Sequence, residues 1–125
     1  MTRFSTTVKI SAPKETVWGV LADLGSISKW NPGVAASHST SPETGGEGAT
    51  RHCDLQNAKG GSIGYLEERA FDWRDGEGFI IDVYESNLPL KRNHVRFDLV
   101  SDGDGTIVTI TPDYVLKFGP LGGYC

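Results

Sequence analysis

Alternation of apolar and polar residues is the dominant pattern along this chain. In residues 3–11 the apolar side chains of Val8 and Ile10 alternate with Lys9 and other polar residues, a period typical of a half-buried β-strand. Later segments repeat this pattern between glycine-rich turns, as consecutive antiparallel strands do. The predicted strands, seven in all, are residues 3–11, 34–40, 48–56, 62–73, 79–85, 94–100 and 106–116.

A helical period follows the first strand. Proline suits the first helical position at Pro13, and from Val17 apolar residues recur at i, i+4 and i+7 as far as Leu24. Gly25 is expected to end this helix with a left-handed cap, and residues 26–30 are long enough only for one further short turn. The order of one strand, two short helices and six strands predicts an α+β fold with a strongly curved antiparallel sheet packed on the first helix.

Length and composition restrict the class of protein. With 125 residues and 38% hydrophobic content, the chain is expected to form one globular domain spanning residues 1–125. A net charge of -4 without a block of Lys or Arg disfavours a nucleic-acid partner. No apolar run is as long as a membrane span, and the N-terminus lacks the apolar core of a signal peptide, so we predict a cytoplasmic protein.

The few candidate metal ligands have unsuitable spacing. His52 and Cys53 are neighbours that would point to opposite faces of one strand, and His38 and His94 add no ligand spacing, so no metal site is predicted. Cys53 and Cys125 are too few for a disulfide framework and are expected to be reduced. The chain has no phosphate-binding loop or dinucleotide fingerprint, so no cofactor is predicted.

One segment carries a family signature. Residues 8–32, VKISAPKETVWGVLADLGSISKWNP, combine a strand that ends in apolar-Ala-Pro, a helix with Val-Trp, an Asp near the helix end and a Trp before Pro. This pattern resembles the N-terminal signature of the SRPBCC superfamily, the START-like, birch-pollen-allergen-like proteins that include polyketide cyclase/dehydrase and lipid-transport proteins. The likeness covers nearly the whole chain. Its positions are Ile10, Ala12, Pro13, Val17, Trp18, Asp23, Trp30, Pro32, Gly48, Arg51, Glu67 or Glu68, Leu88, Pro89, Gly105 and Thr106.

The resemblance implies a helix-grip fold with a cavity between the concave face of the sheet and a long C-terminal helix. Family members bind sterols, lipids, polyketides or plant hormones there. In this chain only Tyr124 and Cys125 follow Gly123, so the long C-terminal helix is expected to be absent or truncated. The apolar sheet face would then need another cover. A homodimer is expected to provide it, with an exchanged segment or a ligand with an open mouth as alternatives.

A hydrophobic small-molecule ligand is therefore expected on the concave face. Strand alternation turns every second residue of the predicted strands toward that face. Aromatic walls with a few polar anchors are usual for such sites. The predicted ligand-binding residues are Trp30, Phe79, Ile81, Val83, Phe97 and Tyr114, and ordinary core packing is the alternative role for Trp30 and Tyr114.

The candidate catalytic residues are polar side chains that the strand pattern turns inward. In the strand of residues 62–73, one register turns Tyr65 and Glu67 inward, whereas a slip of one residue would turn Glu68 inward instead. Arg51 is expected to meet Glu67 inside the cavity, where a low dielectric strengthens ion pairs and ligand contacts, as suits a general acid or base. The alternative is a structural ion pair near the rim.

Three functions fit these residues. The favoured one is binding of a hydrophobic small molecule, such as a lipid, polyketide or aromatic compound. A polyketide cyclase/dehydrase-like enzyme would use Arg51, Glu67 and Tyr65 for acid/base chemistry. A self-association or partner-binding module would use the uncovered sheet face itself. Because one fold hosts all three, the sequence leaves open whether the protein is an enzyme.

Overall fold

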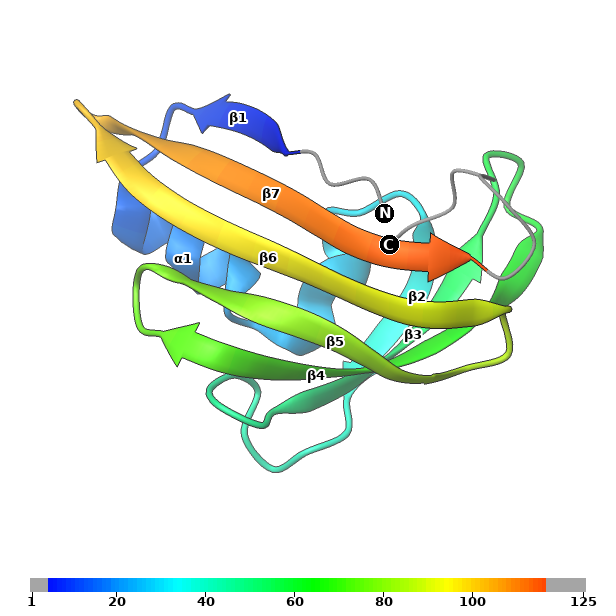
Figure 1. Ribbon diagram of the computed structural model, residues 1–125. Coiled ribbons are helices and arrows are strands. Elements are labelled where there is room, and N and C mark those ends of the chain that lie inside the picture. The colour runs from blue at the N-terminus through cyan, green and yellow to red at the C-terminus, as the bar shows by residue number, and fades with distance from the viewer. Residues whose placement is uncertain (1–4, 117–125) are drawn as a thin grey trace.

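Residues 5–116, which the computed structural model describes, form seven strands and two short helices (Figure 1). At residues 90–93 and 113–116 the description is limited to the backbone. The elements in chain order are β1 (Thr6–Ile10), α1 (Lys14–Leu21), the 3-10 helix η1 (Leu24–Lys29), β2 (Val34–Ser39), β3 (Thr50–Gln56), β4 (Ser62–Arg74), β5 (Gly78–Ser86), β6 (Leu90–Asp102) and β7 (Gly105–Leu116).

All seven strands belong to one antiparallel sheet, in the order β1-β7-β6-β5-β4-β3-β2. Strands β2 to β7 follow one another as a meander, and the last strand, β7, pairs with the first strand, β1. Strands β1 and β2 are therefore the two edges of the sheet. The long strands bend strongly along their length (Figure 1). Helix α1 contacts β6 and β7, while η1 contacts β2 and β3. The predicted curved, seven-stranded antiparallel sheet with two short helices after the first strand is confirmed.

The inner face of the sheet, defined here as the face that carries α1 and η1, holds the core. Phe79 is 2% exposed, and its ring stacks on Trp73 with centroids 4.9 Å apart. Trp18 of α1 meets the same Phe79 ring edge-on at 5.8 Å, and Phe97 lies 5.2 Å from it. Burying one such aromatic side chain stabilises a fold by about 1.5–3 kcal/mol. These rings therefore fix α1 to the sheet.

The first helix is shorter than predicted. It ends at Leu21, and Leu24 begins η1, where its backbone N–H donates to the carbonyl of Thr44. The prediction of a left-handed cap at Gly25 is wrong, because Gly25 lies within η1 and is not among the residues with positive φ. A Cβ at Gly25 would lie 2.8 Å from the backbone nitrogen of Ser39. Glycine is required there for close approach of η1 to β2 rather than for handedness.

The register between β3 and β4 sets which polar residues face the core. Arg51 pairs with Glu68 and Cys53 with Leu66, so these four residues share the inner face. His52 pairs with Glu67 and lies on the outer face. The expected truncation of a C-terminal helix concerns residues outside the described part of the chain.

Candidate functional site

An apolar pocket of about 410 Å³ lies between the β1 edge of the sheet and α1. The volume falls within the range of about 300–1,000 Å³ that is usual for small-molecule sites. Apart from Thr16, every lining residue is apolar. The walls come from β1 (Val8, Ile10), the following turn (Ala12), α1 (Thr16, Val17, Val20, Leu21), the end of η1 (Trp30), β6 (Phe97) and β7 (Val108, Ile110).

The pocket has an apolar rim that reaches solvent, formed by Val8, Ile10, Val20 and Trp30. These side chains are between 37% and 50% exposed, and each of them lines the pocket. They make up four of the seven large apolar side chains that are exposed within the described residues. Isolated exposed apolar side chains are common, whereas a group around one opening marks a binding surface.

The pairing of β1 with β7 explains how the sequence builds this pocket. Val8 lies opposite Val108 in the ladder, so alternation places both on the pocket side. The turn that leads into α1 is fixed by Thr106, whose hydroxyl donates to the carbonyl of Ala12 at 2.7 Å. In α1, Val17 is buried against the sheet while Val20 projects to the rim.

Of the predicted ligand-binding residues, the pocket brings together Trp30 and Phe97. Phe79 and Ile81 do not line it, because they are packed into the core against α1, η1 and neighbouring strands. Val83 packs instead beside Leu66 in a second core cluster. For these three residues the structure corresponds to core packing. The side chain of Tyr114 lies outside the described residues.

The interior acidic residue is Glu68, not Glu67. Glu68 Oε1 lies 2.6 Å from Arg51 Nε, and both side chains are at most 5% exposed. The same oxygen accepts a hydrogen bond from the Cys53 thiol at 3.4 Å, and Arg51 Nη1 donates to the carbonyl of Leu24 at 3.2 Å. The pair therefore links β3, β4 and the start of η1. Neither residue lines the apolar pocket, an arrangement that fits a structural ion pair.

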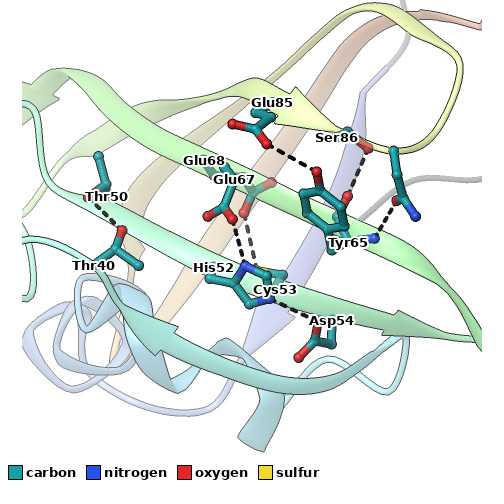
Figure 2. Close-up of polar contacts among 11 residues, drawn as sticks. Thr40, Thr50, His52, Cys53, Asp54, Tyr65, Glu67, Glu68, Glu85 and Ser86 are labelled. Carbon is teal, nitrogen blue, oxygen red and sulfur yellow. Dashed lines mark hydrogen bonds and ion pairs between the residues drawn. The ribbon is translucent and has the colours of Figure 1, made fainter.

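The prediction that Glu67 and Tyr65 face the interior is wrong, because the observed register of β4 turns both outward. The Glu67 carboxylate bonds to His52 on the outer face, and the Tyr65 hydroxyl donates to Glu85 at 3.0 Å (Figure 2). This bond to Glu85 raises the pKa of Tyr65. Tyr65 and Glu67 are thus separated from the pocket by the sheet itself.

The outer face carries a polar network that sequence reasoning missed. His52 bonds through Nδ1 to Glu67 and through Nε2 to Asp54, each at 2.8 Å (Figure 2). Its ring stacks on those of His38, at 5.2 Å, and Tyr65, at 5.8 Å. The hydrogen bond to Glu67, followed by the one to Asp54, raises the pKa of His52. The pairing register places these residues on the outer face and sets their contacts, whereas alternation alone does not decide which face is outside.

Within the described residues, no group of three or more His, Cys, Asp or Glu side chains is arranged to hold a metal ion. His38 stacks on His52, whereas His94 pairs with Asp82 at 3.1 Å on another part of the sheet. Cys53 is buried and has a free thiol. In the same part of the chain, no helix has the length and apolar character required to span a membrane.

Comparison with known proteins identifies the family that the fold and pocket suggest. Residues 1–124 match the family described as polyketide cyclase / dehydrase and lipid transport, and the chain belongs to this family. The resemblance drawn from residues 8–32 is therefore confirmed. A search of curated proteins finds no match to this sequence.

Solved structures share the fold at low sequence identity. A START superfamily protein from Mycobacterium smegmatis has a TM-score of 0.79 and 20% identity, covering 97% of this chain and 81% of its own. The Zhui aromatase/cyclase from Streptomyces sp. R1128 has a TM-score of 0.79 and 19% identity, covering 95% of this chain and 70% of its own. A major latex-like protein from Panax ginseng has a TM-score of 0.77 and 13% identity, covering 93% and 80% respectively.

Proposed function

We propose that this protein binds a hydrophobic small molecule in the pocket between β1, α1, β6 and β7. The observation that carries this proposal is the pocket of about 410 Å³ with its nearly uniform apolar lining and its solvent-facing apolar rim. A ligand that buries about 200 Å² of apolar surface would gain roughly 5 kcal/mol at ~25 cal/mol per Å², before the entropic cost of binding. Membership of a family named for polyketide and lipid proteins supports the same ligand class.

The lining also indicates which part of the ligand enters the pocket. Thr16 provides the single hydroxyl among the lining residues, and no lining residue carries a charge. Burying an unpaired polar group costs free energy, so polar ligand groups are expected to stay at the rim near solvent. We therefore expect the pocket to select ligands by the shape of their apolar part. An aliphatic chain of a lipid or a fused ring system of a polyketide would fit this description.

Binding without turnover fits these residues better than catalysis. A cyclase or dehydrase needs an acid/base group within hydrogen-bond reach of the bound carbonyl or hydroxyl. Arg51 and Glu68 are buried beneath η1 and do not line the pocket, and Glu67 and Tyr65 lie on the opposite face of the sheet. The shared fold with an aromatase/cyclase keeps the enzymatic function as the alternative. A cytoplasmic location stays a prediction.

Two experiments test this proposal: one identifies the bound ligand, and the other introduces a charge at the rim of the pocket. Native mass spectrometry of the purified protein is expected to show a bound apolar molecule. Anilinonaphthalene sulfonate is a fluorophore with an apolar ring system and one charged sulfonate. Titration with it is expected to show binding that Val20→Asp weakens about tenfold or more, because the bound fluorophore would cover the new carboxylate and exclude water from it.

Val100→Asp is the matched control for Val20→Asp. Val100 is 59% exposed and does not line the pocket, so a carboxylate there is expected to leave fluorophore binding unchanged. Thermal unfolding of both variants checks that they are folded. Equal binding by the wild type and Val20→Asp, or equal losses in the two variants, would show that the pocket is not the binding site.

A further inference from the structure

Both ring nitrogens of His52 face carboxylate oxygens. Nδ1 lies 2.8 Å from Glu67 Oε2, and Nε2 lies 2.8 Å from Asp54 Oδ1 (Figure 2). The His52 side chain is 20% exposed and that of Glu67 is 23% exposed, so water has limited access to the bond between them, whereas the Asp54 side chain is 54% exposed. The arrangement joins β3 to β4 on the outer face of the sheet.

This geometry determines how many protons the three groups hold. A neutral imidazole donates from one nitrogen only, and an ionised carboxylate donates nothing. A neutral imidazole with two ionised carboxylates can therefore form only one of the two bonds. Both bonds form only when His52, Glu67 and Asp54 together hold one additional proton. Loss of that proton places a nitrogen lone pair against a carboxylate oxygen, which removes one bond and adds repulsion.

The same ring connects the protonated group to the edge of the sheet. His38 of β2 stacks on one side of His52, and Tyr65 of β4 stacks beside it. Through its hydroxyl, Tyr65 continues the network to Glu85 of β5. We call these contacts of His52 with Glu67, Asp54, His38 and Tyr65 the His52 clasp.

Strand β2 in turn holds the helix that ends at the pocket. The Ser37 hydroxyl of β2 donates to the carbonyl of Gly25 at 2.7 Å and accepts from the N–H of Ser28 at 3.1 Å. Both partners belong to η1, whose C-terminal cap is Trp30. Because Trp30 lines the pocket, the bonds of Ser37 connect β2 to the element that carries one wall of the pocket.

We propose that the His52 clasp is a proton-dependent switch: it holds β2 and η1 in place when protonated, and it loosens both, with the Trp30 wall of the pocket, when the proton is lost. The link to the pocket wall rests on the proposed ligand-binding function. The clasp itself does not depend on that function, because it is inferred from contacts within the sheet.

The direction of the pH response follows from the groups that face His52. Glu67 of β4 and Asp54 of β3 are the carboxylates, His38 of β2 is a second imidazole, and Tyr65 is a phenol. The two carboxylates raise the pKa of His52 above its ordinary value of about 6.5. A raised pKa means that the stabilisation is complete below about pH 6.5 and is lost as the pH rises through the pKa of the folded state.

The test measures amide hydrogen exchange of β2 and η1 at a mildly acidic and a mildly alkaline pH, corrected for intrinsic exchange rates. Protection in the wild type is expected to fall about tenfold or more at the alkaline pH, the factor that one charge-assisted hydrogen bond represents. His52→Gln is expected to abolish this difference. Glu67→Gln keeps the side-chain shape but removes one charge, so the loss of protection is expected at a lower pH.

His94→Gln is the matched control, because His94 also pairs with a carboxylate on the sheet, Asp82, but is not part of the clasp. It is expected to keep the wild-type pH dependence. Protection that is independent of pH in the wild type, or an equal pH dependence in His52→Gln, overturns the switch.

A second measurement separates this inference from the proposed function. The affinity for anilinonaphthalene sulfonate is expected to fall at the alkaline pH in the wild type but not in His52→Gln. Equal affinity at both pH values, with the exchange result as expected, overturns the link to the pocket. If the fluorophore binds at neither pH, the proposed function fails, and hydrogen exchange still decides whether the clasp exists.

Discussion

At the scale of single residues, the buried partners Arg51 and Glu68 are expected to affect stability more than an exposed ion pair does. Their side chains are at most 5% exposed, whereas the exposed pair of Arg69 and Asp82 has side chains 49% and 20% exposed. Removing one member of a buried pair leaves an uncompensated charge in the interior, while an exposed pair loses little. Burial therefore decides which of the two pairs matters.

We expect Glu68→Gln to lower the free energy of unfolding by about 3 kcal/mol, because the buried Arg51 guanidinium would lose the negative charge that lies 2.6 Å from it. The double change Arg51→Met with Glu68→Leu should recover most of this loss, since it removes both charges. Arg69→Gln, at the exposed pair, should cost less than about 1 kcal/mol. Urea unfolding measures all three. A loss in Glu68→Gln no larger than in Arg69→Gln would contradict this account.

The glutamate pair in β4 shows why residue roles were harder to predict than strands. The period of two fixes which residues share a face, but not which face is inside. The first predicted register turned Tyr65 and Glu67 inward, yet Leu66 and Ala70 are the buried residues. A bulge between Phe71 and Arg74, with Asp72 at φ 50°, then shifts the phase so that Trp73 packs against the core. No sequence signal marked this bulge in advance.

At the level of elements, η1 depends on its contacts with the sheet. Short 3-10 helices have poor hydrogen-bond geometry and gain little stability by themselves. Ser37 bonds to the Gly25 carbonyl and Arg51 to the Leu24 carbonyl, which ties the start of η1 to β2 and β3. The length of residues 26–30 predicted a short turn after the first helix, but the close approach of η1 to β2 depends on atoms from distant segments.

Two glycines in this region should respond oppositely to alanine. Gly25→Ala places a Cβ 2.8 Å from the backbone nitrogen of Ser39, and we expect it to destabilise the fold by about 1–3 kcal/mol. Gly19 lies in α1 with no atom within 4 Å of its would-be Cβ, so Gly19→Ala should stabilise by roughly 0.5–1 kcal/mol through helix propensity. Thermal unfolding tests both. Changes in unfolding temperature of the same sign in both variants would show that crowding at Gly25 does not determine the effect of its replacement.

On the scale of the whole molecule, the order of elements predicted the architecture better than it predicted the pocket. The apolar stripe expected to face a ligand is largely covered by Trp18, Leu21 and Leu24 from the two helices. The open space lies instead beside β1, where strands from both ends of the chain meet α1. Alternation shows which residues face inward, but the position of a helix over the sheet depends on packing between segments far apart in sequence.

The homodimer expected from the sequence, through an uncovered sheet face, stays a prediction. In the structure the apolar rim of Val8, Ile10, Val20 and Trp30 is exposed, and we expect a dimer to form through this rim instead. Two rims facing each other would bury apolar area worth about 25 cal/mol per Å², and two-fold pairs dominate soluble homo-oligomers. Sedimentation at micromolar concentration should show a dimer that Val20→Asp dissociates and Val100→Asp leaves intact. Because a ligand would occupy the same surface, adding anilinonaphthalene sulfonate should shift the wild type toward monomer. A wild-type protein that is monomeric without ligand would contradict association through this rim.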